Sequence, residues 1–231
     1  MGGRKIAVQL ASTSSKAPAP TTSTTQRSGS KAAAINERLI LSTAGDVLSL
    51  FEAEGGDFNH VNFATSLHRL GKLSRSFEKS STPLLRKIVD RATSSIINES
   101  DLWKSRELSN ACWGIAKIGN VQAPALFDAV AAEAPKKIAT FNPQELTNIL
   151  WAYATAGVEA PALFEAVAAE SSKKIATFNS QDLANTVWSY STAGVEAPAL
   201  FEAVAVEAPK KIATFTPQAL ANTVWAYSTA G

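Results

Sequence analysis

Apolar residues recur at helical spacing from about residue 36 to the end of the chain. In one stretch Leu146, Ile149, Leu150 and Tyr153 fall on one face of a predicted helix. A second face of the same helix is also apolar, so we expect packed neighbours on both of its sides. A second helix with its own apolar stripe follows from Pro161, and each unit is therefore predicted to be a helical hairpin.

Polar residues and prolines mark the ends of these helices. Asn142 and Glu145 have the spacing of a capping box before the first helix, and Gly157 can end it in a left-handed conformation. Pro135 and Pro209 fall inside the second helices of two units. We expect a kink or a break there, because proline lacks the N–H that a helix needs.

The hairpin is repeated along the chain. Residues 158–194 and 195–231 are near-copies that differ at seven of 37 positions. One tryptophan per unit keeps a step of 37 or 38 residues: Trp113, Trp151, Trp188 and Trp225. We interpret these tryptophans as core residues rather than a stacking platform, because their sequence neighbours are apolar. A fixed period of this length predicts an all-α fold, a right-handed α-solenoid of stacked helical hairpins.

We divide the chain into three parts. Residues 1–35 form a leader, residues 36–100 a degenerate and basic first repeat or pair of repeats, and residues 101–231 the regular tandem repeats. The last unit reaches Gly231 directly after its first helix, so we expect the chain to be truncated there, without the partner helix.

The leader is rich in Ser, Thr, Ala and basic residues and has no acidic residue before Glu37. This composition is typical of an organelle transit peptide, which would place the protein in a chloroplast or mitochondrion, and otherwise in the cytoplasm. A disordered, solvated tail is the alternative, since the same composition offers few apolar groups to bury.

Charge and composition exclude several functions. The net charge is +2, but residues 101–231 hold twelve acidic and nine basic residues, so nucleic-acid binding by bulk positive charge is excluded there. Cys112 is the only cysteine, and the two histidines form no motif with metal-ligand spacing. No apolar run reaches the roughly 18 residues of a membrane span. We expect no enzyme activity, no metal, no cofactor and no membrane partner.

The strings NPQELTNILWAYATAG, NSQDLANTVWSYSTAG and TPQALANTVWAYSTAG resemble the octotricopeptide repeat family and the helical repeats of organellar proteins that carry a RAP domain. The resemblance covers roughly residues 58–231, and this sequence contains no RAP domain. It implies an organellar factor that binds single-stranded RNA, not DNA, and that acts in the stability, processing or translation of a transcript.

If RNA is bound, the third face of each first helix supplies candidate contacts. An asparagine recurs there in every unit: Asn110, Asn148, Asn185 and Asn222. Its amide can both donate and accept hydrogen bonds, as a base edge requires. Variable neighbours would tune the choice of base: Glu145, Asp182 and Ser189. The alternative is a buried asparagine ladder between units, with the two acids acting only as caps.

Basic residues form a second set of candidates. Two lysines recur at the end of each second helix: Lys136, Lys137, Lys173, Lys174, Lys210 and Lys211. This row can follow RNA phosphates, or it can simply stabilise the helix C-terminus through the backbone dipole. The first repeat is more basic than the later ones, so we add Arg69 and Lys72 to the candidate RNA contacts.

A protein–protein interaction scaffold of the HEAT or armadillo type is the rival function. The acidic balance of the repeats favours a protein partner. The asparagine row would then grip an extended peptide backbone instead of RNA bases.

Overall fold

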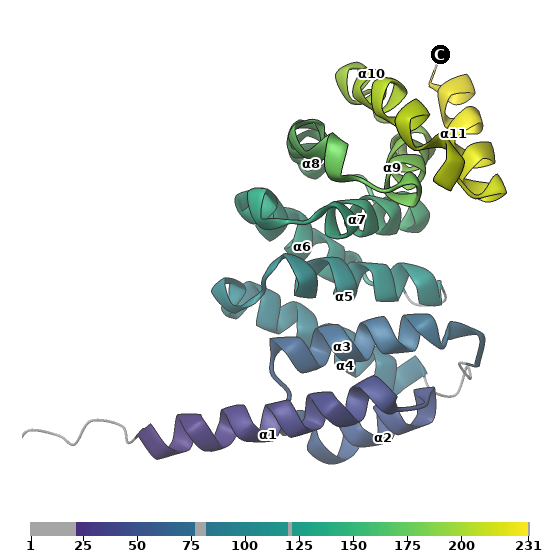
Figure 1. Ribbon diagram of the computed structural model, residues 1–231. Coiled ribbons are helices and arrows are strands. Elements are labelled where there is room, and N and C mark those ends of the chain that lie inside the picture. The colour runs from purple at the N-terminus through teal and green to yellow at the C-terminus, as the bar shows by residue number, and fades with distance from the viewer. Residues whose placement is uncertain (1–21, 77–81, 120–121, 231) are drawn as a thin grey trace, which may run out of the picture.

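The computed structural model describes residues 22–76, 82–119 and 122–230, and these residues form eleven α-helices and no strand. Helices α1, α3, α5, α7, α9 and α11 stack in one layer and the remaining helices in a second (Figure 1). The first layer comprises α1 Thr22–Leu41, α3 His60–Lys72, α5 Ser105–Ile118, α7 Pro143–Ala156, α9 Ser180–Ala193 and α11 Pro217–Thr229. The second comprises α2 Ala44–Glu54, α4 Thr82–Asn98, α6 Pro124–Lys137, α8 Pro161–Lys174 and α10 Pro198–Glu207. The fold is the predicted all-α solenoid of helical hairpins.

The array extends further toward the N-terminus than the sequence pattern predicts. Residues 22–35, assigned above to the leader, form the first part of α1. Ala32 and Ile35 are buried, and α1 packs on α2 and α3. The rest of the predicted leader, residues 1–21, lies outside the described residues.

The predicted caps start and end the regular helices. The Asn142 side chain accepts the Glu145 N–H at 2.9 Å, and the Glu145 carboxylate accepts the Asn142 N–H at 3.0 Å, so the capping box is confirmed. Gly157 and its counterpart Gly194 both end their helices with φ at 65°. This left-handed conformation favours glycine because it has no Cβ.

The two prolines in the second helices behave differently. Pro135 lies inside α6, which continues to Lys137 without a break. Pro209 follows the end of α10 and lies in the 3-10 helix Ala208–Thr214. The predicted break is therefore present at Pro209, whereas Pro135 falls in the last turn of α6, where little helix remains to be disrupted.

A tyrosine on α7, α9 and α11 joins the two layers, and it is fully buried on α7 and α9. The Tyr190 hydroxyl on α9 donates to the carbonyl oxygen of Phe164 on α8 at 2.7 Å, and the two rings meet edge to face at 5.2 Å between centroids. The same arrangement links Tyr153 to Phe127 and Tyr227 to Phe201. Each tyrosine thus fixes a first helix on the second helix that precedes it.

The first-layer helices approach one another closely through small residues. A Cβ at Gly114 of α5 would lie 2.2 Å from the carbonyl oxygen of Leu67 on α3. The same position, directly after the repeated tryptophan, is fully buried in the later units: Ala152, Ser189 and Ala226. The second-layer helices pack less closely. A solenoid built this way has the first layer on its inner side.

A lysine at the end of each second helix ties it to the preceding unit. Lys174 Nζ donates to the carbonyl oxygens of Ala139 and Phe141, both at 2.8 Å. The equivalent bonds join Lys137 to Ser100 and Trp103, and Lys211 to Ala176 and Phe178. Since these carbonyls lie at the turn before a first-layer helix, the lysine joins that turn to the end of the second helix; of the six oxygens, the one of Ser100 also accepts the Trp103 N–H.

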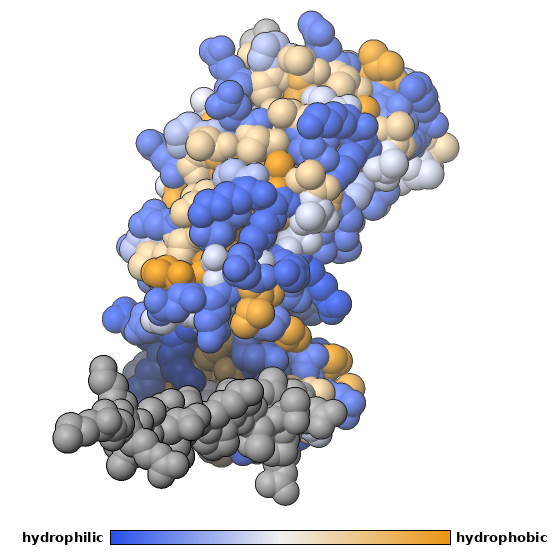
Figure 2. Space-filling view, turned by 90° about the vertical axis from the view of Figure 1, so that its left-hand side faces the viewer, coloured by the Kyte–Doolittle hydropathy of each residue, from blue (hydrophilic) through white to orange (hydrophobic). Residues whose placement is uncertain are grey.

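The side of the array that faces left in Figure 1 is mostly hydrophilic, with apolar residues scattered in small patches among the residues described (Figure 2). Within the described ranges, no helix combines the length and the apolar character that crossing a membrane would require.

Candidate functional site

A stripe of polar residues with one tryptophan per unit runs along the solvent side of the first-layer helices. In α7 it consists of Gln144, Asn148, Trp151 and Thr155, which are exposed or half-buried; the residues on both sides of Asn148 and of Trp151 are buried. We call this stripe the first-helix ridge. Its members in α5, α7, α9 and α11 are Arg106, Asn110, Trp113, Lys117, Gln144, Asn148, Trp151, Thr155, Gln181, Asn185, Trp188, Thr192, Gln218, Asn222, Trp225 and Thr229.

The four ridge asparagines keep their amides free. Asn110, Asn148, Asn185 and Asn222 are half-buried, and none of their side chains forms a hydrogen bond within the described residues. No amide of the four is a buried atom without a partner. The structure therefore does not contain the asparagine ladder given above as the alternative, and the amides face solvent with donors and acceptors unused.

The ridge tryptophans are not core residues, which corrects the interpretation drawn from their neighbours. Trp113, Trp151 and Trp188 are half-buried and Trp225 is 44% exposed. Three rings at the N-terminal end form a row: the centroid of Trp113 lies 5.0 Å from that of His68 and 6.3 Å from that of Trp151. Each ring packs partly on the array and leaves the remainder to solvent, one helical turn from the ridge asparagine.

At its N-terminal end the ridge borders a hollow of about 660 Å³, which we call the N-terminal groove. The groove brings together residues from α1, α3, α5 and α7 and from the start of α9. It is lined by Asn36, Ile40, Thr65, His68, Arg69, Lys72, Arg106, Asn110, Trp113, Asn142, Gln144, Glu145, Asn148 and Gln181. Five predicted contacts share it: Asn110, Asn148, Glu145, Arg69 and Lys72.

The groove has a positive electrostatic character. Burial, and then the positive charges of Lys72, Arg106 and Arg69, lower the pKa of His68 to about 4. The imidazole is therefore neutral at pH 7. Arg69 is held in place by its Nε, which donates to the carbonyl oxygen of Ser42 at 2.8 Å.

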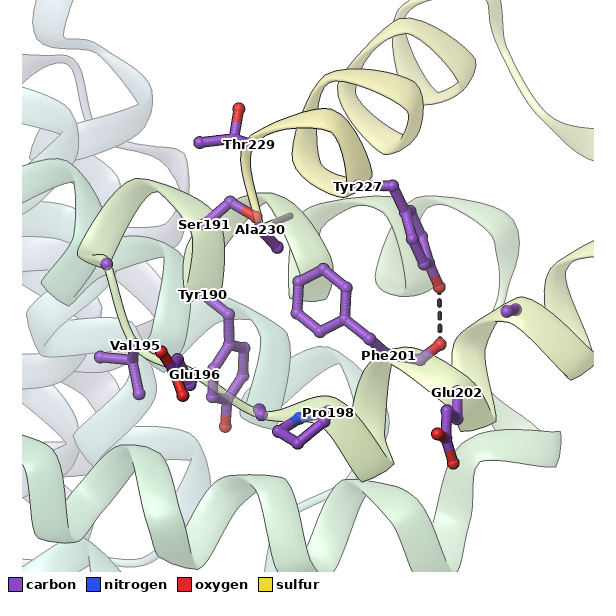
Figure 3. A pocket seen from close by; sticks show the side chains of 13 residues that line it. Tyr190, Ser191, Val195, Glu196, Pro198, Phe201, Glu202, Tyr227, Thr229 and Ala230 are labelled. Atoms are coloured by element: carbon purple, nitrogen blue, oxygen red, sulfur yellow. Dashed lines mark hydrogen bonds between the residues drawn. The ribbon is translucent and has the colours of Figure 1, made fainter.

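A second hollow, of about 670 Å³, lies between α9, α10 and α11 (Figure 3). Phe201 and Tyr227 point into it, and the Tyr227 hydroxyl donates to the Phe201 carbonyl oxygen at 2.6 Å. Its charged lining residues are Glu196 and Glu202, and its surface is mainly apolar. This hollow contains none of the predicted contacts and no group of titratable residues suited to chemistry.

A comparison with known protein families shows to which family the chain belongs. A model of the RNA-editing substrate-binding complex 6 protein family matches residues 6–229. The chain belongs to that family. No curated protein matches it. The RNA-editing substrate-binding complex 6 family is thus represented here by a helical solenoid, and the resemblance to octotricopeptide repeats rests on the repeat strings alone.

In this member of the RNA-editing substrate-binding complex 6 family, two of the variable neighbours of the asparagines, Asp182 and Ser189, are buried, whereas Glu145 is half-buried and lines the N-terminal groove. Glu145 and Asp182 cap their own helices, and burial raises the pKa of Asp182, which is only 7% exposed. Ser189 is fully buried, and its hydroxyl donates to the Asn185 carbonyl oxygen at 2.7 Å. Ser189 and Asp182 are therefore not accessible to a ligand on the ridge, because they lie within the packing between units.

The repeated lysines also have partners within the protein. Lys173 pairs with Glu170 at 3.1 Å, and its equivalents Lys136 and Lys210 pair with Glu133 and Glu207. The inner lysines of each pair, Lys137, Lys174 and Lys211, donate to carbonyls as described above. These bonds give the lysines a structural role that differs from the one set against phosphate binding above, which was an interaction with the backbone dipole of their own helix. The outer lysines remain exposed, and phosphate contact by them stays a prediction.

Sequence reasoning missed three kinds of ridge residue. Gln144, Gln181 and Gln218 lie one turn before the asparagines, Arg106 takes the same place in α5, and the tryptophans lie one turn after. The spacing of four and three residues around each asparagine was the available signal. No group of three His, Cys, Asp or Glu side chains within the described ranges is placed to hold a metal.

Proposed function

We propose that the protein binds single-stranded RNA along the first-helix ridge. The observation that carries the proposal is the set of four unpaired amides, repeated once per unit on an accessible ridge and each one turn from a half-exposed tryptophan. Amides recognise base edges through paired hydrogen bonds, and indole rings offer a surface on which a base can stack. Unpaired bases in single strands present both features.

Family membership supports the same substrate class. The family name refers to a complex that binds the RNA substrates of editing. We propose that this chain contributes an RNA-contacting surface to such an assembly, in a mitochondrion or chloroplast, and that it acts there as a binder and not as a catalyst. The leader composition supports an organelle, and a fusion of residues 1–40 to a fluorescent reporter tests it by import and cleavage.

The asparagine row gives the direct test. The variant N148A/N185A/N222A removes three amides from the ridge and should weaken binding of a single-stranded RNA pool at least tenfold, since each paired contact contributes about 1–3 kcal/mol. The control is N98A on α4, whose amide donates to the Ser94 carbonyl oxygen outside the ridge. Filter binding measures affinity, and a thermal melt within a few degrees of wild type shows that the fold is retained. Unchanged affinity in the triple variant would remove the proposal.

The scaffold function remains the competing outcome of a second experiment. Crosslinking in extract, with and without ribonuclease, separates the two functions. Recovery of RNA in the crosslinked material supports RNA binding by the ridge. Protein partners that survive digestion, with no RNA recovered, would favour the scaffold, because an amide row can also pair with a peptide backbone.

A further inference from the structure

We propose that the N-terminal groove is a phosphate site that anchors the RNA backbone at one end of the ridge, through Lys72, Arg106 and Arg69. The inference rests on the proposed function. It adds which part of the surface binds the RNA phosphates and which part does not. It divides the surface into a cationic anchor on α3 and α5 and an uncharged base-contacting stretch on α7, α9 and α11.

Three cations converge on the groove from two neighbouring helices. Arg69 and Lys72 come from the last turns of α3, and Arg106 comes from the first turn of α5. Lys72 and Arg106 are exposed, and none of the three forms an ion pair with an acid in the described part of the chain. Glu145, the acid of the groove lining, is engaged as a helix cap. Three cations against one carboxylate leave the lining of the groove with a net positive charge, as in an anion site.

The neutral state of His68 supports the same reading. Its ring lines the groove together with the three cations, and their charges add to burial in lowering its pKa. A neutral imidazole can donate or accept a hydrogen bond beside a bound phosphate. The His68 ring also contacts the Trp113 ring, the first tryptophan of the ridge.

The other cations on or near the ridge already contact groups of the protein itself. The Lys117 ammonium lies 5.5 Å from the centroid of the Trp151 ring, and the repeated lysines pair with glutamates or carbonyls. In α7, α9 and α11 the ridge residues are amides, threonines and tryptophans, with no charge. A ligand that carries anionic groups at one end of this surface and planar, neutral, hydrogen-bonding groups along the rest matches a nucleotide chain better than an acidic peptide.

If phosphates are bound only at the anchor, the affinity for RNA should depend only weakly on salt concentration. Each neutralised phosphate of a single strand contributes about 0.7 to the slope of log affinity against log salt. With three cations in the anchor, the slope of the wild-type chain should be about −2. A protein that tracked phosphates along all units would give a much steeper slope.

The experiment measures that slope with the full chain by fluorescence anisotropy, using labelled 16-nucleotide single-stranded RNA from 50 to 300 mM KCl. The test variant is K72Q/R106Q. The matched control is R86Q/K87Q, which removes the same charge from exposed positions on α4, in the other layer. Each RNA is prepared with a 5′-phosphate and with a 5′-hydroxyl, so that a terminal phosphate and an internal one are distinguished. Thermal melts confirm that both variants are folded.

The anchor predicts that K72Q/R106Q makes the slope less steep, from about −2 to about −0.7, the value for one remaining phosphate contact. The control R86Q/K87Q should keep a slope of about −2. Dependence on the 5′-phosphate would assign the site to an RNA end, and equal binding of both RNAs would assign it to an internal phosphate. Equal slopes for the two variants would overturn the anchor and leave RNA binding intact. Failure of the wild-type chain to bind RNA would overturn the proposed function and the anchor together.

Discussion

The position after each ridge tryptophan shows how single residues organise this array. The sequence shows Gly114, Ala152, Ser189 and Ala226 there, and of these Ser189 was predicted to tune the choice of base. The structure buries all four between neighbouring first-layer helices. What varies is therefore the fit of one helix against the next, and the constant asparagine, not its variable neighbour, is what reaches solvent.

A methyl group at Gly114 should be enough to disturb that fit. Its Cβ would lie 2.2 Å from the Leu67 carbonyl oxygen, so G114A forces α3 and α5 apart and should lower the free energy of unfolding by about 1–3 kcal/mol. The control G45A adds a methyl group with nothing within 4 Å and should leave stability unchanged or raise it by up to about 1 kcal/mol. Urea titrations compare the two. Equal stabilities would mean that the helices do not approach as closely as described.

His68 should make stability depend on pH in the mildly acidic range. The folded-state pKa of about 4 lies below the value of about 6.5 in an unfolded chain, so the unfolded state takes up a proton first as the pH falls. The contribution of neutral His68 to the free energy of unfolding is complete above about pH 6.5. It is lost progressively toward pH 4, and the loss amounts to about 2 kcal/mol after allowing for partial exposure of the ring. Urea unfolding between pH 6.5 and 5 should show the decline in wild type and a flatter profile in H68Q. Parallel profiles would contradict the assignment.

At the scale of the element, the paired lysines at the ends of the second helices perform different tasks. Lys174 is 27% exposed in its side chain and joins Glu170 to the carbonyls of the preceding unit. Lys173 is 70% exposed and contacts Glu170 alone. Hydrogen bonds from both lysines lower the pKa of Glu170. The inner lysine therefore connects elements, whereas the outer one adds a surface ion pair.

Replacing each lysine by methionine separates these tasks. K174M leaves two carbonyl oxygens without their donor and removes one of the two ammonium groups that pair with Glu170, and it should lower the free energy of unfolding by about 1–3 kcal/mol. K173M removes the same charge but only an exposed pair, and should cost about 0.5 kcal/mol or less. Thermal melts of the two variants provide the comparison. A larger loss in K173M would show that the connection between units does not depend on Lys174.

These elements also show what the sequence determines and what it leaves open. The capping box at Asn142 and the stop at Gly157 depend on neighbours in sequence, and both were predicted with their residues. The face of the helix on which Trp151 lies depends on where the adjacent units sit. When a helix has two apolar faces, the sequence pattern does not define where its third, polar face begins and ends. An indole ring also suits either a core or a half-exposed position. The sequence pattern predicted the ridge asparagines, missed the glutamines beside them and assigned the tryptophans to the core.

At the scale of the whole molecule, the array consists of interchangeable units. Each hairpin contacts only its neighbours in the sequence of units, so stability should be close to a sum over hairpins and the interfaces between them. Leu220 and Val224 on α11 are exposed, whereas their counterparts Leu183 and Val187 on α9 are fully buried by the following unit. Within the described residues, a unit thus completes its core only when another packs against it.

Deletion of one period tests this modularity. Removing residues 158–194 joins Gly157 to Val195, which restores the same local sequence, GVEAPALF, at the junction. Lys211 would then meet the carbonyls of Ala139 and Phe141, the acceptors that Lys174 now uses. The shortened chain should keep its helix content per residue, unfold at lower urea because one interface is lost, and have a maximum dimension shorter by about 8–10 Å in solution scattering.

The control deletes residues 158–176 and removes α8 without α9, so two first-layer helices follow one another with no second-layer helix to return the chain. This variant should lose helix content well beyond the residues removed, because the tyrosine contact between layers and the lysine contact between units are both broken in one hairpin. Circular dichroism at 222 nm distinguishes the two deletions. Similar losses in both would show that the 37-residue hairpin is not the unit of stability, and the ridge would then depend on the integrity of the entire array.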